Sequence, residues 1–383
     1  MKKLILFVVE IFLLFVLSGN SAFAVENPLA VPNNKVGIHI LFTEEINLAA
    51  QLVNSNGGDW GYVTIPIQAG DKNILKWQAF MNTAKQKHVI PIIRLATEGD
   101  YFNTQVWRKP TAEDVLDFAN FLNSLSWPTK NKYILVFNEV NRGNEWGGSP
   151  NPQEYADLLF YAATVFKNKD QDFYIISAGM DNVAPNSPGK LMDNYEFLTQ
   201  MHDFLPNVFD NVDAIGSHSY PNPGFSQSPF NQGKASIATF QYEKALVKSL
   251  SGRDLPVFIT ETGWSQATLS QLIISQYYDQ AFNSAWKDPS IIAVTPFLLE
   301  AGGDPFGSFS FVTNNQPNTI FIGLQKLSKV KGEPIQPPIF ISPESTSSAN
   351  VLGTRTFPKT QTDQTIMSVP ESLKILVKWL LKL

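Results

Sequence analysis

Eight short apolar runs, separated by longer amphipathic stretches, dominate the sequence between residues 35 and 330. The runs are VGIHIL from Val36, GYVTIPI from Gly61, VIPIIRLA from Val89, YILVFNE from Tyr133, FYIISAG from Phe173, VDAIGSHS from Val212, PVFITE from Pro256 and IIAVTPFLL from Ile291. Between them, in stretches such as ILKWQAFMNTAKQK, apolar residues recur every three to four positions, as on one face of a helix. Strands that alternate with helices pair in parallel. Eight such units predict a closed (β/α)8 (TIM) barrel rather than a doubly wound open sheet, since no glycine-rich phosphate loop follows the first strand.

The chain length of 383 residues agrees with one catalytic domain, because barrels of this type use roughly 200 to over 400 residues as a single domain. We place the barrel domain at residues 25–330. The remaining predicted parts are a signal peptide at residues 1–24, a Pro/Ser/Thr-rich linker at residues 331–370 and a basic amphipathic helix at residues 371–383.

The amino terminus has the pattern of an export signal. Lys2 and Lys3 precede an apolar run, and the small residues of Ala22-Phe23-Ala24 suit a signal peptidase, so cleavage is expected after Ala24. The alternative is an uncleaved anchor, but the apolar run is shorter than the roughly 17 residues that a membrane-spanning helix requires. We therefore expect a protein that is secreted or associated with the cell surface.

The carboxyl-terminal stretch ESLKILVKWLLKL has a basic face and an apolar face. Lys374, Lys378 and Lys382 are four positions apart, and leucines and a valine occupy the other side. Such a helix can lie on an anionic membrane surface, dock on the main domain or be the remnant of a sorting signal. The sequence leaves these three roles open.

Composition excludes several classes of function. The net charge is −5 and the central region has no cluster of lysines and arginines, so no nucleic-acid partner is expected. The chain has no cysteine, and histidines 39, 88, 202 and 218 lack the spacing of metal ligands. We therefore assign no metal and no cofactor. A GxSxG motif is absent, which argues against a serine hydrolase. The remaining expectation is a monomer that binds a neutral ligand with ring faces.

Polar residues gather where the predicted strands end. In a (β/α)8 barrel the carboxyl ends of the strands meet at one mouth, where catalytic residues lie. The polar and aromatic residues at these ends are His39, Arg94, Asn138, Glu139, Asp181, His218, Tyr220, Glu261, Trp264 and Glu300. Each alone could be an ordinary polar group at a strand end, but their shared placement predicts a site.

Two of these residues suit the cleavage of a glycosidic bond. The reaction requires a proton on the leaving oxygen and electron density at the anomeric carbon, and a pair of carboxyl groups supplies both. We assign Glu139 as the general acid/base and Glu261 as the nucleophile, with Tyr220 donating a hydrogen bond that keeps Glu261 ionised. A retaining mechanism requires the carboxyl groups to be about 5–5.5 Å apart, and an inverting one about 6.5–9.5 Å.

The motifs FNEVN, SHSYP and ITETGWS, at the ends of the fourth, sixth and seventh predicted strands, resemble those of the large (β/α)8 clan A of retaining glycoside hydrolases. This clan contains many cellulases, mannanases, xylanases, galactanases and β-xylosidases, and the resemblance covers roughly residues 35–325. It implies a retaining mechanism with the shorter carboxyl distance. It also implies that Asn138 hydrogen-bonds the 2-hydroxyl group of the sugar.

Five further residues are predicted to bind substrate or support the glutamates. Arg94 would hold the charge of the nucleophile, and His218 and His39 would contact substrate or orient neighbouring groups. Trp146 and Trp264 would stack on sugar rings. The alternatives are a salt bridge inside the mouth for Arg94 and a place in the core for His39 and the tryptophans.

The sequence departs from the clan in two places. Where many members have a tryptophan at the end of the eighth strand, this chain has Phe297 and Glu300, so Phe311 or another ring would have to replace it. The proline that commonly follows Asn-Glu is Val140 here. Glu145 and Glu300 are additional carboxylates that could be mistaken for the catalytic pair.

These observations predict a secreted retaining glycoside hydrolase that acts on β-linked oligosaccharides or polysaccharides. Two alternatives use the same residues. One is a barrel that binds carbohydrate at the cell surface without cleaving it, and the other is a transglycosylase.

Overall fold

The structure is a computed structural model that describes residues 25–99, 104–301, 303, 305–314 and 316–337. All described residues belong to one compact unit. Eight of its strands run parallel, namely β1 (Gly37–His39), β2 (Gly61–Gln68), β3 (Val89–Ala96), β4 (Lys132–Val136), β5 (Phe173–Ser177), β6 (Ile215–His218), β7 (Val257–Glu261) and β8 (Ile291–Val294). The predicted alternation of parallel strands with helices is confirmed.

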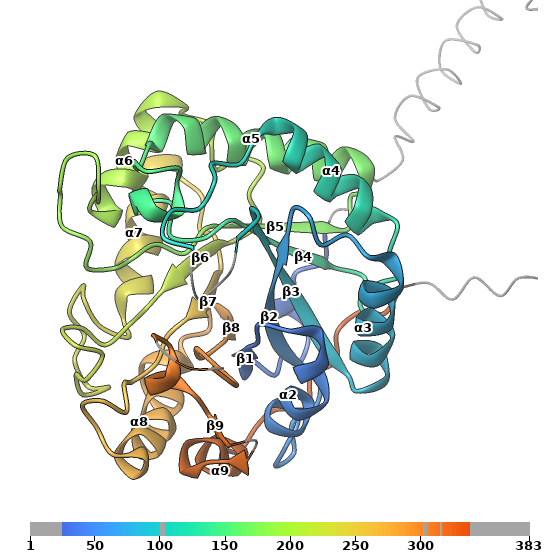
Figure 1. Ribbon diagram of the computed structural model, residues 1–383, viewed down its shortest axis with the longest axis vertical. Coiled ribbons are helices and arrows are strands. Elements are labelled where there is room, and N and C mark those ends of the chain that lie inside the picture. The colour runs from blue at the N-terminus through green and yellow to red at the C-terminus, as the bar shows by residue number, and fades with distance from the viewer. Residues whose placement is uncertain (1–24, 100–103, 302, 304, 315, 338–383) are drawn as a thin grey trace, which may run out of the picture. The chain divides into compact units, whose positions relative to one another are not determined.

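The strands form a closed ring (Figure 1). Strands β1 to β5 are neighbours in chain order, and so are β6 to β8. Two parallel bridges join these groups, Ile176 with Ala214 between β5 and β6, and Val36 with Val294 between β1 and β8. Closure leaves no free sheet edge and brings the carboxyl ends of all eight strands together around one mouth.

Helices surround the ring (Figure 1). They are α2 (Ile46–Val53), α3 (Ile74–Gln86), α4 (Ala112–Asn123), α5 (Pro152–Lys169), α6 (Asn194–Phe204), α7 (Thr239–Ser251), α8 (Gln271–Asn283) and α9 (Thr319–Lys326). Short 3-10 helices are η1 (Pro28–Ala30), η2 (Thr43–Glu45), η3 (Gly143–Glu145), η4 (Ala285–Lys287) and η5 (Gly307–Phe309), and a two-stranded antiparallel ribbon pairs β9 (Val312–Thr313) with β10 (Gln316–Pro317). Polar side chains fix several helix starts. Asn73 caps α3, and Thr111 forms a capping box with Asp114 on α4.

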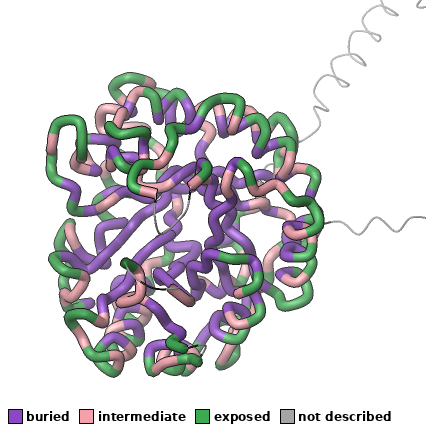
Figure 2. The backbone as a smooth tube through the Cα atoms, in the orientation of Figure 1, coloured by how far each residue is buried: buried purple, intermediate pink, exposed green. Residues whose placement is uncertain are grey.

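Side chains of the strands alternate between two separate apolar cores. On β3, Ile90 and Ile92 belong to the core inside the barrel, whereas Val89 and Ile93 belong to the core between the barrel and the helices. Figure 2 shows the strands buried and the outer sides of the helices exposed. Because successive strand residues point to opposite faces, the same alternation turns Arg94 inward at the mouth.

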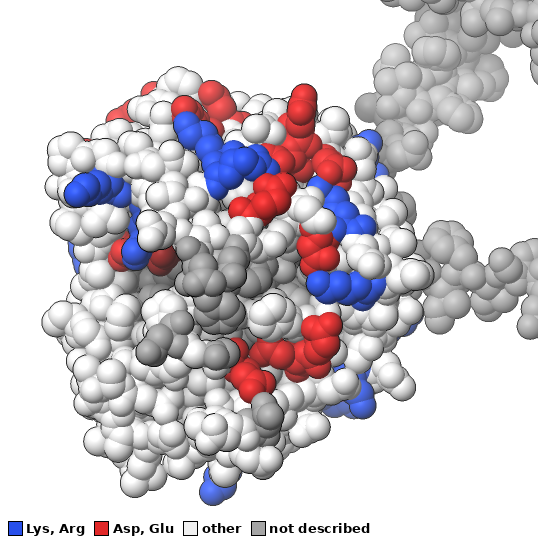
Figure 3. All heavy atoms as spheres, viewed as in Figure 1, with Lys and Arg blue, Asp and Glu red and all other residues white. Residues whose placement is uncertain are grey.

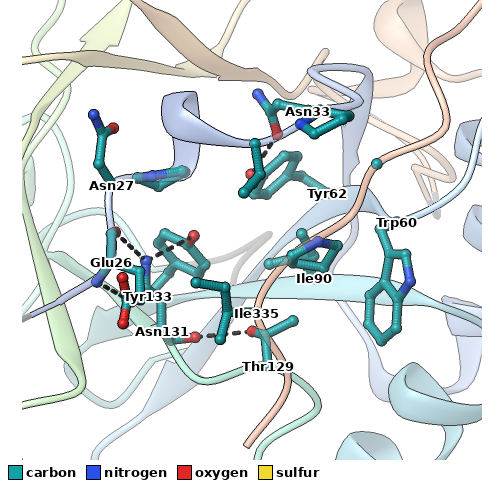
Figure 4. Close-up of a pocket in the computed structure, with 15 residues that line it drawn as sticks. Glu26, Asn27, Asn33, Trp60, Tyr62, Ile90, Thr129, Asn131, Tyr133 and Ile335 are labelled. Carbon is teal, nitrogen blue, oxygen red and sulfur yellow. Dashed lines mark hydrogen bonds between the residues drawn. The ribbon is translucent and has the colours of Figure 1, made fainter.

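The amino ends of the strands are covered by the two ends of the described chain. Figure 4 shows a pocket there, in which the Tyr62 hydroxyl donates to the Asn33 side chain (2.8 Å) and Asn131 bonds the backbone of Glu26. On the other side of the pocket, the Lys130 N–H donates to the Ile335 carbonyl (2.9 Å). The first residues of the predicted linker therefore belong to the barrel, and the remainder of the linker lies outside the described residues.

The predicted signal peptide and the carboxyl-terminal amphipathic helix also lie outside the described residues. Within residues 25–337 and apart from the gaps given above, no helix has both the length and the apolar composition needed to cross a membrane.

Candidate active site

Glu139 and Glu261 face each other at the mouth of the barrel. Glu139 follows β4 and Glu261 is the last residue of β7, on opposite parts of the ring. One carboxylate oxygen of each glutamate and one ring nitrogen of His218 all lie within 4.8 Å of one another. Residues 122 positions apart in the sequence thus form one cluster.

A sharp change of backbone direction after β4 positions Glu139. Phe137 and Glu139 both have positive φ angles, 68° and 32°, which non-glycine residues seldom adopt. The N–H of Glu139 donates to the carbonyl of Gly179 (3.0 Å), so the turn is tied to the chain after β5. Non-glycine residues in this region cost about 1–3 kcal/mol each and are typical of functional sites.

Two hydrogen bonds and two close histidines surround Glu261, which is 7% exposed, and one of these histidines is His218, with Nδ1 3.7 Å from Oε2. Arg94 Nη1 donates to Oε1 (3.0 Å), and the Tyr220 hydroxyl donates to Oε2 (3.1 Å). His39 Nε2 lies 3.7 Å from Oε1. A cationic donor and a hydroxyl donor both favour the ionised carboxylate.

Glu139 has a different set of partners. His218 Nδ1 lies 3.1 Å from Glu139 Oε1, and Arg142 Nε lies 3.6 Å from Oε2. Arg142 also donates to Asp181 (2.9 Å), which lies after β5. Arg142 therefore bridges the segments that follow β4 and β5.

His218 and Glu139 hold a proton together. Burial alone would lower the pKa of His218, but the charges of Glu261 and Glu139 raise it above its ordinary value. Burial works against ionisation of Glu139, yet the hydrogen bond and charge of His218, with Arg142, keep the pKa of Glu139 below its ordinary value. The hydrogen bond between His218 and Glu139 therefore links the protonation of the two groups.

Two local features direct the His218 ring toward the glutamates. The register between β6 and β7 shifts between Ser217 and His218, and such a bulge re-aims the side chain that follows it. Gly179 provides the space, since a Cβ atom there would lie 2.1 Å from His218 Cδ2. The ring of His218 is fully buried and does not line the cleft.

His39 is buried behind Glu261. Burial, with the charges of Arg94 and His218, lowers the pKa of His39 well below its ordinary value, so the ring is neutral. Its edge packs against Phe297, with ring centroids 5.2 Å apart. The Tyr220 hydroxyl donates to Glu261 as predicted, and His218 contacts Glu139, which agrees with the predicted alternative of orienting a neighbouring group. His39, His218 and Tyr220 are not among the residues that line the cleft.

A cleft of about 360 Å³ opens in front of the two glutamates. This volume suits a small ligand. Its lining includes Arg94, Asn138, Glu139 and Glu261 from the prediction, and the aromatic side chains Trp107, Phe137, Phe297 and Phe306. The side-chain oxygen of Asn138 is buried and has no hydrogen-bond partner among the described residues, so it is available to a ligand.

The predicted stacking role of Trp146 and Trp264 is wrong. Both are 1% exposed. Trp146 packs against Phe137 and Tyr155, and Trp264 packs against Tyr278 and Trp286. Phe311 is also buried, so it does not replace the strand-eight tryptophan. Phe297 and Phe306 take the aromatic positions in the cleft instead.

Several residues of the site have no signature in the sequence. Gly179, Arg142 and Trp107 lie in segments between strands and helices, whose shape depends on tertiary contacts. Arg142, three residues after Glu139, is the one that spacing could have suggested, because a cation so close to a buried carboxyl group affects its ionisation.

Glu139, His218 and Glu261 are also close enough to one another to hold a metal ion. The spacing of the histidines in the sequence did not indicate this cluster. The donors around them argue against that use. Arg94 and Tyr220 already bond the two oxygens of Glu261, and the raised pKa of His218 opposes the neutral form that a metal ligand must take. The cluster fits an ionised carboxylate pair better.

The fold and the site together define a (β/α)8 barrel with paired glutamates at the carboxyl ends of β4 and β7. No protein-family model and no curated protein matches the chain. Among solved structures, the chain is similar to glycoside hydrolases. A family 39 glycoside hydrolase from the gut symbiont Bacteroides cellulosilyticus WH2 matches at 14% identity with a TM-score of 0.53, over 79% of this chain and 64% of that one.

Two more solved structures show the same likeness. A family 39 β-xylosidase from Caulobacter crescentus matches at 14% identity with a TM-score of 0.54, over 77% of this chain and 72% of that one. A family 128 endo-β-1,3-glucanase from Sorangium cellulosum matches at 15% identity with a TM-score of 0.53, over 76% of this chain and 98% of that one. At these identities the likeness establishes a shared fold. The chain spans slightly less than two thirds of the Bacteroides enzyme.

Proposed function

We propose that the protein is a retaining glycoside hydrolase that cleaves β-glycosidic bonds by double displacement. The observation that carries this proposal is the separation of the two glutamates, whose nearest oxygens are within 4.8 Å. This agrees better with the short spacing of retaining enzymes than with the longer spacing of inverting enzymes, which place a water molecule between their carboxyl groups. The glycoside hydrolase neighbours, which include a β-xylosidase and an endo-β-1,3-glucanase, support the reaction class.

In the first step, the Glu261 carboxylate attacks the anomeric carbon while the bond to the leaving oxygen breaks. The hydrogen bonds from Arg94 and Tyr220 orient the Glu261 carboxylate for this attack. Glu139 gives a proton to the leaving oxygen, and the proton held by His218, 3.1 Å away, is available to Glu139 through their hydrogen bond.

In the second step, Glu139 is a carboxylate and takes a proton from water. The water oxygen attacks the anomeric carbon, and the bond to Glu261 breaks, which releases the sugar and restores the carboxylate. The unpartnered oxygen of Asn138 lies in the same cleft and suits a hydrogen bond to a sugar hydroxyl group.

The reaction is tested with the purified protein and a panel of β-linked xylo- and gluco-oligosaccharides. We expect the wild type to release sugars whose first-formed anomer is β, as observed by NMR. Glu261→Gln and Glu139→Gln should each lower kcat/KM by about 10³-fold or more, because each removes a group that acts in the transition state. Binding without cleavage by all three proteins would indicate a carbohydrate-binding barrel instead.

We also propose that the protein is exported, with cleavage after Ala24, and that the basic carboxyl-terminal helix contacts a membrane surface. Support comes from the sequence patterns alone. Mass spectrometry of the protein from its native cells should find Val25 at the amino terminus. An intact Met1 terminus would contradict export through a cleaved signal.

A further inference from the structure

Glu145 is a third carboxyl group in the cleft, beside the catalytic pair. It is the last residue of η3, six positions after Glu139, and it lines the same cleft as Glu139 and Glu261. Its side chain is half-buried. It is not part of the Glu139–His218–Glu261 cluster, so it does not replace either catalytic carboxylate.

Among the charged residues that line the cleft, Glu145 differs in that its side chain makes no hydrogen bond or salt bridge within the described part of the chain. Arg94 pairs with Glu261, and Glu139 with His218. The other two cleft arginines, Arg108 and Arg142, pair with Glu98, Asp114 and Asp181. Polar groups that are buried in a folded protein normally have a partner. An unpartnered carboxyl group that faces a cleft is therefore available to a ligand.

The backbone holds Glu145 in place from both sides. The Trp107 N–H donates to the carbonyl of Asn144 (2.7 Å), and the ring of Trp146 is buried against Tyr155. Gly143 allows the loop to close tightly, since a Cβ atom there would lie 2.6 Å from the Gly148 carbonyl oxygen. Because the backbone around Glu145 is held in place, its carboxyl group can make specific contacts with a ligand in the cleft.

The charge around Glu145 selects against anionic ligands. Burial raises the pKa of Glu145 to about 7, and the charges of Glu139 and Glu261 add to this effect, whereas the charges of Arg94 and Arg142 oppose it. Each cleft arginine is neutralised by a carboxylate, so none is free to bind an anionic sugar. Figure 3 shows acidic and basic side chains next to one another on the viewed face, with a separate acidic group and no broad basic patch.

We propose that Glu145 is a specificity-determining residue that hydrogen-bonds the hydroxyl groups of an uncharged sugar in the cleft and disfavours sugars that carry a carboxylate. A hydroxyl group both donates and accepts, so it matches Glu145 whether or not the carboxyl group carries a proton. The proposal takes the ligand to be a sugar and in this respect rests on the proposed function.

Binding is measured by calorimetry in a Glu261→Gln background, so that substrate is not consumed. The probes are neutral xylo- and β-1,3-gluco-oligosaccharides and uronate-bearing oligosaccharides of the same length. We expect Glu145→Ala to weaken binding of the neutral sugars by about tenfold or more, because a hydrogen bond to a half-buried carboxyl group is lost. Glu145→Gln keeps the shape and hydrogen-bonding capacity and should bind within about threefold of the parent. Glu113→Ala, on the exposed surface of α4, is the matched control and should change nothing.

Kinetics of the same substitutions with Glu261 intact give a second measurement. Glu145→Ala should raise KM for neutral substrates more than it lowers kcat, and the melting temperature should show that the variant is folded. Unchanged binding in Glu145→Ala would overturn the proposal. So would tighter binding of the uronate sugars than of the neutral ones, or no binding of any neutral sugar.

The outcomes separate this proposal from the proposed function. Binding that depends on Glu145 in a wild type that cleaves nothing would contradict hydrolysis and leave the role of Glu145 intact. Hydrolysis that does not change in Glu145→Ala would support the proposed function and contradict the role of Glu145.

Discussion

At the scale of single residues, the absence of a side chain at Gly179 decides where the His218 ring lies. A methyl group at this position would overlap the ring, with a Cβ to Cδ2 distance of 2.1 Å, so the ring must move away from Glu139. We expect Gly179→Ala to lower kcat/KM by about 10²-fold, the usual contribution of acid/base assistance, and to destabilise the fold by about 1–3 kcal/mol through overpacking. Steady-state kinetics and urea unfolding measure the two effects.

Gly70→Ala is the control for this substitution. A Cβ atom at Gly70 would make only an ordinary contact of 3.6 Å with the Glu98 side chain. We expect its kinetics to match the wild type. Wild-type activity in Gly179→Ala would show that the position of the His218 ring does not matter for the reaction.

The proton shared by Glu139 and His218 predicts the alkaline limb of the pH profile. The raised pKa of His218 means that the pair keeps its last proton to a higher pH than an ordinary histidine would. The proton can bind either Glu139 or His218. Removing the His218 site therefore lowers the proton affinity of the pair. In His218→Asn, the alkaline limb of kcat/KM should therefore move to lower pH. A limb that stays in place would mean that His218 does not share the catalytic proton.

The sequence predicted the glutamates and Arg94 for a simple reason. Ionisable residues at the ends of apolar strands are unusual, and a closed barrel brings such ends together. It failed for Trp146 and Trp264, because an aromatic residue beside a motif can point into the cleft or into the outer core, and only the path of the loop decides which. In both cases the loop turns the ring toward the helices.

At the scale of elements, the strands and helices could be predicted from the periodicity of apolar residues. The hydrogen bonds that connect a helix to the ends of the strands could not. Tyr155 on α5 is an example. Its hydroxyl donates to the Val136 carbonyl at the end of β4 (3.0 Å) and accepts from the Ala178 N–H after β5 (2.7 Å). One helix thus fixes the ends of two neighbouring strands just before Glu139. The sequence shows only an aromatic residue on the buried face of a helix.

Tyr155→Phe keeps the ring and removes only this bridge. It leaves a buried N–H and a buried carbonyl without a partner, which should cost about 1–3 kcal/mol in the free energy of unfolding. Activity should also fall, because the turn that carries Glu139 begins at Val136. Chemical denaturation measures the first effect and kinetics the second. Tyr161→Phe on the same helix, where the ring is half-buried, is the control and should differ from wild type by less than about 0.5 kcal/mol.

The bulge on β6 shows why the register of the mouth could not be read from the sequence. A regular strand would place His218 by simple alternation, but the shift after Ser217 sets it opposite Glu261 instead. Bulges depend on the pairing of two strands that lie far apart in the chain. Their position therefore has no local signature.

At the scale of the whole molecule, closure of the ring positions the site and also buries groups that have no role in it. Glu243 on α7 is 2% exposed, far from solvent between the helix and the strands. Asn194 donates to its Oε1 atom (2.8 Å), and Oε2 has no hydrogen-bond partner among the described residues. Burial raises the pKa of Glu243 to about 7, although the Asn194 hydrogen bond and the nearby Ser217 hydroxyl act in the opposite direction.

This buried acid makes the stability of the protein depend on pH. A carboxyl group whose pKa is higher in the folded state binds more protons there than in the unfolded state, so the free energy of unfolding falls as the pH rises from about 4.5 to 7. Glu243→Gln resembles the protonated acid at every pH. It should match the wild type near pH 4.5 and be more stable by up to about 3 kcal/mol above pH 7. Urea unfolding across this range measures the difference, with the exposed Glu113→Gln as control. If the two stability curves run parallel, Glu243 has the same proton affinity in both states, and the unpartnered oxygen must be solvated by water inside the fold.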